Sequence, residues 1–298
     1  MERRSFLQAS MMAFGAISLQ KINLLKNRTM DTWNITMLTP EIGIFTERGG
    51  TIAFHYSPGG MTVVDAQFPD TAQHLIDELK KRNKQPYRLL INTHHDGDHT
   101  SGNIDFKSLV NRVLAHENSA INQKRVAVAN KNEDKQLYPN QTFSQDWKED
   151  IGKEKISLNY FGPAHTDGDS IIHFENANIA HVGDLVFNRR HPFVDHSAGA
   201  SMQNWVKVLD AAMKKYDDKT VFICGHSGND HDVKGSKEML SSFQQYLVNV
   251  LQFVETEMKS GKSKEDILKA TEIPGSPEWK GDGIERPLTA AFEELSNA

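Results

Sequence analysis

This sequence has little cysteine, few long apolar runs and no excess of positive charge, and these absences bear on disulfides, membrane spans and nucleic-acid partners. A single cysteine, Cys224, among 298 residues rules out a disulfide within the chain, so the core alone must hold the fold. The 39 acidic residues outnumber the 34 Lys and Arg, and a net charge of −5 argues against a nucleic-acid backbone as the main partner. Beyond the N-terminus, no segment approaches the length of a transmembrane helix. The content of 38% hydrophobic and 24% charged residues is typical of a globular protein.

The N-terminal residues resemble an export signal. The paired arginines Arg3 and Arg4 precede an uncharged stretch over 9–19, a pattern similar to twin-arginine signals. That stretch is too short to span a bilayer stably, and a segment that stays in the cytoplasm is the alternative. We therefore predict an export signal over 1–28, a periplasmic or exported mature protein without a membrane span, and one domain over 29–298.

Short apolar runs and helical periodicity alternate along the rest of the chain. Apolar runs punctuated by Gly and Pro start at Ile35 and predict strands, and a second group of strands is expected over 155–182. The polar segment 132–150 is expected to be a loop or a covering hairpin. No low-complexity linker divides the chain, which indicates one domain of the α/β class. Apolar residues at three- and four-residue spacing predict helices over 71–84, 117–130, 201–215, 235–259 and 263–270.

Histidine and aspartate gather in four turns, each of which contains glycine and follows an apolar, strand-like segment. Loops at strand ends are where a rigid sheet can aim side chains at a common point, so we expect the four turns to converge. The turns are His94-His95-Asp96-Gly97-Asp98-His99, Gly162-Pro163-Ala164-His165, Gly183-Asp184 and Gly225-His226.

The residue types in these turns are those that bind metal ions. Imidazole and carboxylate hold zinc or a similar first-row metal without any thiolate. Several ionisable groups packed together repel and desolvate one another unless a cation compensates, so a structural role alone does not explain the run from His94 to His99. Four converging turns supply up to seven ligands, which is enough for two metal ions that each keep a position open for water.

The order of the four turns resembles the metallo-β-lactamase superfamily. Its hallmark is H-x-H-x-D-H after a buried strand, followed by Gly-x-x-His, then Gly-Asp, then a late Gly-His. The resemblance covers nearly everything from Ile35 to Leu251 and includes Asp65, which follows the apolar pair Val63 and Val64. It implies a four-layer αββα sandwich of two mixed β-sheets flanked by helices, with the metals at one edge.

The resemblance also implies a role for each residue of the motif. Two divalent metal ions are expected, zinc in the first place, with iron and manganese as alternatives. Asp98 is expected to orient the attacking water as the catalytic residue, besides binding metal. The implied ligands are His94, Asp96 and His165 for the first metal, Asp98, His99 and His226 for the second, and Asp184 as a bridge between the two.

Asp96 departs from the family pattern, which has a histidine at that position. A carboxylate there is a harder ligand that shifts the preference from zinc toward iron or manganese, or weakens the first site. DNA-uptake competence proteins of the superfamily look similar in this respect. His95 is a conceivable substitute, but adjacent side chains point apart, so we predict Asp96 as the ligand.

The implied activity is hydrolysis by a hydroxide that two metals activate. The substrate is expected to be a small molecule, and export favours a β-lactam or another cyclic amide or ester. The alternatives are an iron-binding redox protein of the persulfide-oxidising type, a phosphodiesterase, and a binding protein with a degenerate site. Metal analysis separates the metal-containing alternatives from the last one.

A loop beyond Asp184 is the candidate border of the substrate site. It holds His191 and His196 beside the pair Arg189 and Arg190. The two arginines either meet an anionic substrate or form an ordinary surface pair, and the sequence leaves both interpretations open.

Overall fold

The first of two β-sheets has seven strands and is of mixed direction. The structure, a computed structural model, describes residues 33–297. Strands β1 to β4 pair antiparallel, and β4 to β7 continue the sheet in parallel. Along β5 the side chains alternate, because Leu89 and Ile91 face the other sheet while Leu90 faces the outer helices. The strands are β1 (Asn34–Met37), β2 (Ile42–Thr46), β3 (Ile52–Ser57), β4 (Gly60–Val64), β5 (Tyr87–Ile91), β6 (Val113–His116) and β7 (Gln141–Phe143).

The second sheet has six strands in the order β13-β12-β11-β10-β9-β8. All neighbours are antiparallel except β11 and β12, which run parallel. The strands are β8 (Asp146–Ile151), β9 (Glu154–Asn159), β10 (Ile171–Phe174), β11 (Ile179–Asn188), β12 (Val221–Ser227) and β13 (Lys234–Gly235).

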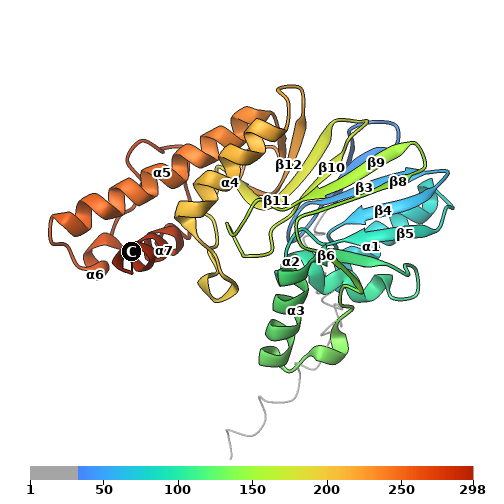
Figure 1. Cartoon of the computed structure of the whole chain (residues 1–298), viewed down its shortest axis with the longest axis horizontal. Helices are drawn as coiled ribbons and strands as arrows, with labels where there is room; N and C mark the ends of the chain where they lie inside the picture. The colour runs from blue at the N-terminus through green and yellow to red at the C-terminus, as the bar shows by residue number, and fades with distance from the viewer. Residues whose placement is uncertain (1–32, 298) are drawn as a thin grey trace, which may run out of the picture. The chain divides into compact units, whose positions relative to one another are not determined.

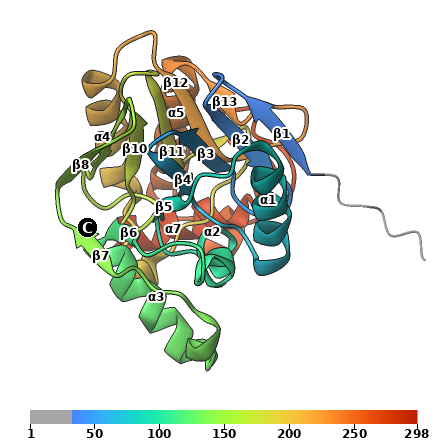
Figure 2. The ribbon, with the colours of Figure 1, turned by 90° about the vertical axis from the view of Figure 1, so that its right-hand side faces the viewer.

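Helices cover the outer faces of both sheets, so the fold has four layers (Figures 1 and 2). Apolar residues of α1 pack with the outer face of the first sheet, and α4, α5 and α7 pack with the outer face of the second. A third apolar cluster lies between the sheets. The helices are α1 (Pro69–Arg82), α2 (Gly97–Thr100), α3 (Glu117–Asn130), α4 (Met202–Lys215), α5 (Lys237–Lys259), α6 (Lys264–Ile267) and α7 (Glu285–Ser296), with 3₁₀ turns η1 (Ser101–Phe106), η2 (Glu133–Lys135) and η3 (His196–Ala198).

This architecture confirms the predicted αββα sandwich and corrects one local prediction. The segment 132–150 is not a loop, because it supplies β7 and β8, the edge strands of the two sheets. β8 alternates between exposed and half-buried residues and carries charges, and charged residues on an edge strand discourage pairing with other chains. That polarity is what made the segment look like a loop in the sequence.

The predicted export signal over 1–28 lies outside the described residues. Within residues 33–297, no helix has both the length and the apolarity required to cross a membrane. Cys224 is buried in β12, and burial raises the pKa of its thiol to about 12, which makes it an inert core residue.

Candidate metal centre

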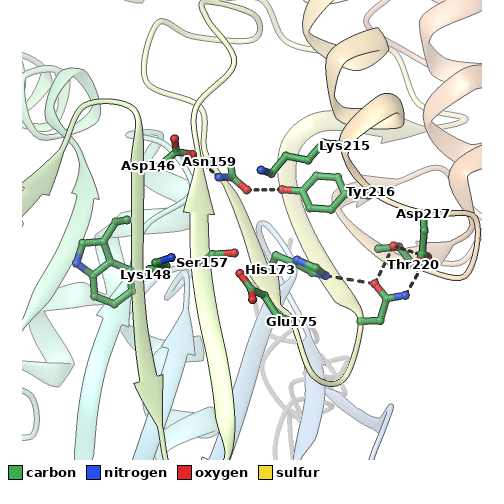
Figure 3. Close-up of a pocket in the computed structure, with 12 residues that line it drawn as sticks. Asp146, Lys148, Ser157, Asn159, His173, Glu175, Lys215, Tyr216, Asp217 and Thr220 are labelled. Carbon is green, nitrogen blue, oxygen red and sulfur yellow. Dashed lines mark hydrogen bonds between the residues drawn. The ribbon is translucent and has the colours of Figure 1, made fainter.

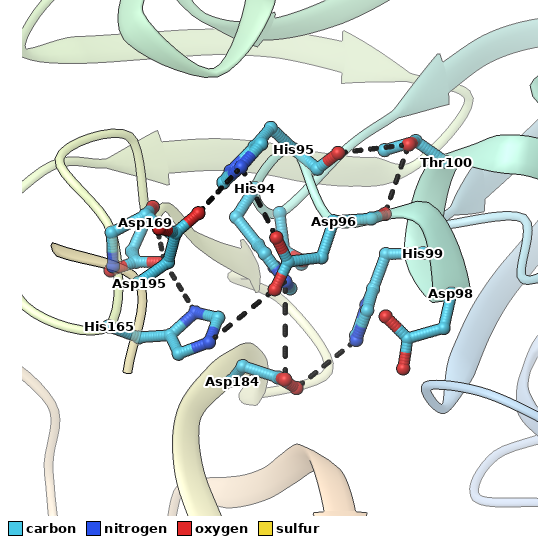
Figure 4. A network of polar contacts seen from close by, with 12 residues as sticks. His94, His95, Asp96, Asp98, His99, Thr100, His165, Asp169, Asp184 and Asp195 are labelled. Carbon is cyan, nitrogen blue, oxygen red and sulfur yellow. Dashed lines mark hydrogen bonds and ion pairs between the residues drawn. The ribbon is translucent and has the colours of Figure 1, made fainter. Parts of the chain in front are cut away.

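The four predicted turns meet at one place in the fold. Figure 4 shows residues of the first three, and His226 of the fourth lies 3.5 Å from Asp184. His94 follows β5, His165 lies between β9 and β10, Asp184 is in β11, and His226 is near the end of β12. The register of β11 on β12 shifts on both sides of Gly183, whose φ is +52°. A bulge of this kind re-aims the next side chain, which here is the Asp184 carboxylate.

Local hydrogen bonds fix the first turn. The side-chain amides of Asn92 and Asn103 pair with each other at 3.0 and 2.8 Å, which joins the end of β5 to η1. The hydroxyl of Thr100 donates to the backbone carbonyls of His95 and Asp96 at 3.1 and 3.0 Å. These contacts hold the backbone from which the predicted ligands project.

One group of side chains comprises His94, Asp96, His165 and Asp184, whose candidate ligand atoms lie within 4.8 Å of one another. Asp96 Oδ2 is 3.5 Å from His94 Nε2 and 3.5 Å from His165 Nε2, and Asp184 Oδ2 is 4.0 Å from His94 Nε2. His95 is not in this group, since its Nε2 approaches the other Asp96 oxygen at 3.3 Å.

The second group comprises Asp98, His99 and His226. His226 Nε2 is 3.1 Å from Asp98 Oδ2 and 3.4 Å from His99 Nε2. Asp184 reaches this group as well, because its Oδ1 is 3.2 Å from His99 Nε2 and its Oδ2 is 3.5 Å from His226 Nε2. All seven predicted ligands are therefore brought together, with Asp184 between the two groups.

These residues fit a pair of metal ions. Among the described residues, the buried atoms His94 Nε2, His165 Nε2 and Asp184 Oδ1 have no hydrogen-bond partner. Leaving a buried polar atom unsatisfied costs about 1–3 kcal/mol, so three in one place are expensive unless another group binds there. Because imidazole nitrogens and carboxylate oxygens are the ligands of zinc, iron and manganese, a cation meets this requirement.

The charges of the cluster also favour cations. Burial alone raises the pKa of Asp184, but the neighbouring His226 and His99 outweigh burial and hold that pKa well below its ordinary value. Burial alone lowers the pKa of His165, but Asp169 and two further carboxylates raise it to about 9. Without metal, protonated imidazoles thus compensate the carboxylates, and metal binding replaces those protons.

Supporting residues that sequence analysis did not assign hold the candidate ligands in place. Asp65 is completely buried, accepts the backbone N–H of Thr93 at 2.8 Å, and lies 2.8 Å from His99 Nδ1. The Thr93 hydroxyl donates to Asp65 at 2.7 Å and lies 2.9 Å from His94 Nδ1. In the sequence, the supporting role of Asp65 is indicated only by its position directly after a buried strand.

A second carboxylate supports the other side of the site. Asp169 Oδ1 lies 3.4 Å from His165 Nδ1, and Asp169 also accepts the N–H and the hydroxyl of Thr166 at 2.7 and 2.9 Å. The carboxylates of Asp65 and Asp169 thus lie behind the rings of His99 and His165 and turn their Nε2 atoms toward the site.

Replacing Asp65 is expected to weaken metal binding without removing a ligand. Asp65→Asn keeps the size of the side chain but loses the charge that orients His99, so the affinity for one metal ion should fall about 10–100-fold. Chelator competition with the purified protein measures this affinity. Asp70→Asn is the matched control, because Asp70 is exposed and pairs only with Arg48 among the described residues. An unchanged affinity in Asp65→Asn would contradict the supporting role.

A cavity of about 380 Å³ opens over the cluster. Of the predicted arginine pair, Arg190 lines this cavity, whereas the guanidinium of Arg189 stacks 4.4 Å from the ring of Trp279. His191 lines the cavity and shares a 2.7 Å hydrogen bond with Tyr246. The full lining is Asp96, Gly97, Asp98, Asp184, Phe187, Arg190, His191, Phe193, His226 and Arg286.

A larger cavity of about 820 Å³ lies elsewhere, between the strands β8 to β10 and the end of α4 (Figure 3). Asn159 and Tyr216 share a 2.9 Å hydrogen bond there, and His173 lies 3.3 Å from Asn178. None of the seven candidate ligands lines this cavity, so its residues are not part of the metal centre.

Comparison with known proteins agrees with the fold and the cluster. The family described as the metallo-beta-lactamase superfamily matches residues 52–226, which contain all four turns. The chain belongs to the metallo-beta-lactamase superfamily, as its motif order predicted. Membership supports a metal-dependent hydrolase as the general class of enzyme and divalent metals as the usual cofactor.

Individual relatives are distant. The chain is 29% identical over 139 residues to the 2,4-dinitroanisole O-demethylase subunit alpha of Nocardioides sp. (strain JS1661), a match that covers 46% of this chain. It is 26% identical over 158 residues to metallo-beta-lactamase IND-1 of Chryseobacterium indologenes, a match that covers 52% of this chain. The matches span only 41% and 61% of those two proteins' own lengths.

A solved structure shares the fold at low identity. A metallo-beta-lactamase from Pontibacter korlensis has a TM-score of 0.62 and 19% sequence identity, and the match covers 73% of this chain and 100% of that one. At this identity the likeness establishes the fold alone.

Proposed function

We propose that this chain is a two-metal hydrolase that acts on a small molecule with an amide or ester bond. The observation that carries the proposal is the position of Asp184, whose carboxylate lies between two groups of candidate ligands. Such a carboxylate is suited to bridge two cations. The proposed ligand set is the predicted one, with His94, Asp96 and His165 on one side and Asp98, His99 and His226 on the other.

When bound, the two metals would lower the pKa of a water and polarise the scissile carbonyl. The protein's own part in the reaction falls mainly to Asp98. Its side chain is about one-third exposed, lines the cavity, and is anchored at 3.1 Å from His226. A carboxylate in that position can accept a proton from the attacking water and deliver it to the leaving group.

The cavity lining favours a small substrate that carries a negative charge. The volume of about 380 Å³ suits a molecule of drug size, and Arg190 and Arg286 place two cations in the wall. Phe187 and Phe193 add apolar surface for the body of the substrate. A β-lactam or another cyclic amide or ester with a carboxylate has this combination, and the relative from Chryseobacterium indologenes is named as a metallo-beta-lactamase.

A substrate panel on the purified, metal-loaded protein tests the proposal. We expect two metal ions per chain and the fastest turnover on a chromogenic cephalosporin or an acyl-lactone. A thioester, an aryl phosphodiester and 2,4-dinitroanisole complete the panel. Preferred turnover of the phosphodiester, or bound iron with persulfide oxidation and no hydrolysis, would overturn the proposed substrate class. Protein that binds no metal would overturn the proposed mechanism.

Removing the Arg190 guanidinium should raise KM more than it lowers kcat. A hydrogen bond to a charged group contributes about 1.5–3 kcal/mol, so Arg190→Met should raise KM for a carboxylate-bearing substrate at least about tenfold. Steady-state kinetics measure the change. Arg189→Met is the control, since Arg189 packs on Trp279 and does not line the cavity. Equal effects of the two variants would count against recognition by Arg190.

A further inference from the structure

A buried histidine and a carboxylate lie behind Asp96, the residue that stands where the superfamily motif has histidine. His95 is 4% exposed, and its Nε2 is 3.3 Å from Asp96 Oδ1 and 3.5 Å from Asp195 Oδ2 (Figure 4). Asp195 lies 100 residues further along the chain, in the loop after β11. Two carboxylate oxygens this close to one ring nitrogen favour the tautomer that carries a hydrogen on Nε2, which then faces Asp96 and Asp195.

The two oxygens of Asp96 thereby have different surroundings. Oδ2 faces the first group at 3.5 Å from both His94 Nε2 and His165 Nε2, while Oδ1 faces His95. A carboxylate offers two equivalent oxygens on one carbon, whereas the two ring nitrogens of an imidazole point in different directions, so only one of them can face a given metal ion. Aspartate at this position therefore needs a donor that occupies one oxygen and leaves the other for the metal.

Asp195 is itself held firmly. Its Oδ1 accepts the backbone N–H of Ser197 at 2.9 Å and the Ser197 hydroxyl at 2.6 Å, which leaves Oδ2 for His95. The carboxylate also accepts the N–H of Ala198 at 3.3 Å, at the start of η3. On the far side, the guanidinium of Arg125 from α3 approaches Asp195 Oδ2 at 4.0 Å.

We propose that His95 and Asp195 are positioning residues that hold Asp96 as a one-oxygen ligand of the first metal. The superfamily motif has a histidine at this position, and a histidine presents a single nitrogen to the metal. His95 and Asp195 make Asp96 equivalent in this respect, because the N–H of His95 occupies one carboxylate oxygen and leaves only the other for the metal. This inference rests on the proposed function, since it requires Asp96 to bind metal. Orientation of a ligand by such outer contacts typically changes metal affinity 10–100-fold.

A double-mutant cycle between His95 and Asp96 tests the proposal. His95→Leu removes the donor, and His95→Gln keeps an N–H within similar reach. Each is made in the natural chain and in Asp96→His, and the affinity for each metal ion is measured by chelator competition, with stoichiometry by elemental analysis. His196→Gln is the control. His196 is next to Asp195 in the chain, but the hydrogen-bond partners of its ring are the carbonyls of Ala200 and Ala290.

In the natural chain, His95→Leu should lower the affinity for one metal ion about 10–100-fold, and the affinity of His95→Gln should be close to that of the natural chain. Asp195→Asn should lower the affinity for the same ion by a smaller factor. In the Asp96→His background, His95→Leu should change the affinity less than about threefold, because an imidazole bound to metal has no second oxygen for His95 to occupy. Metal-free melting curves should show that all variants remain folded.

Four outcomes overturn the proposal, and one of them also overturns the ligand set of the proposed function. If His95→Leu lowered the metal affinity equally in the natural chain and in Asp96→His, His95 would only support the fold. Three ions per natural chain, falling to two in Asp195→Asn, would make His95, Asp96 and Asp195 a cation site of their own, since their ligand atoms also lie within 4.8 Å. If Asp96→Ala leaves metal binding unchanged, the ligand set of the proposed function fails together with the positioning pair. If only Asp96→Ala weakens binding, the pair alone fails.

Discussion

Asp184→Asn is expected to lower kcat/KM by roughly 10³-fold, or about 4 kcal/mol, and to reduce the bound metal below two ions per chain. Asparagine has nearly the same shape, so the change removes charge and one strong ligand atom rather than packing. Asp184 is the residue that contacts both groups, at 3.2 Å from His99 and 4.0 Å from His94. Its loss therefore affects both ions, whereas the loss of any other ligand affects one.

Elemental analysis and steady-state kinetics on the leading substrate measure the two effects. Asp210→Asn is the matched control, because Asp210 lies on the surface of α4 and pairs only with Lys214 among the described residues. The control should keep two ions and activity within about twofold. If Asp184→Asn retained both ions and activity within tenfold, the two-metal mechanism would be wrong.

Gly225→Ala is expected to be nearly as damaging, although glycine offers no functional group. A Cβ at Gly225 would collide with the Asp184 carboxylate and would lie 3.1 Å from the backbone of Gly183. The backbone cannot yield easily, because the carbonyl of Gly225 accepts the N–H of Thr51 at 2.8 Å and its hydroxyl at 3.0 Å. The Asp184 carboxylate must move instead, and a displacement of about 1 Å at a reactive centre can cost 10²-fold in rate.

The measurements are again activity and metal content, together with the melting temperature of the metal-free protein. Gly97→Ala adds the same methyl group to the same site, but its nearest neighbour is the Ser101 hydroxyl at 3.2 Å, which can rotate away. We expect Gly97→Ala to stay within about fivefold of the natural chain. Full activity in Gly225→Ala would show that Asp184 tolerates the shift and does not act as a tightly placed bridge.

The family and the convergence of the turns could be predicted from sequence because both depend on local patterns, and the sandwich fold followed from the family resemblance. The run from His94 to His99 follows a buried strand, and strand ends are where a sheet presents loops. The helix over 235–259 was equally clear from its spacing and is observed as α5. The edge strand β8 was missed, because the stability of an edge strand comes from its neighbour in the sheet rather than from its own polar residues.

Residues outside the motif that support or line the site could not be predicted from local sequence patterns. Asp65 stands 34 positions before His99, and Asp195 stands 100 positions after His95, so no local pattern links either pair. Arg286 reaches the cavity from α7, a helix that is not among those predicted from the sequence. Each of these contacts exists only because distant segments pack together.

The sequence by itself determined which side chains gather at the site, since the ligand types and their order lie within four short turns. Only the tertiary structure decided how they act together. It placed Asp184 between the two groups, set Gly225 where a methyl group would collide with the Asp184 carboxylate, and set His95 against one oxygen of Asp96. The physical reason is that ligand chemistry belongs to single residues, whereas orientation depends on contacts between the two sheets and their loops.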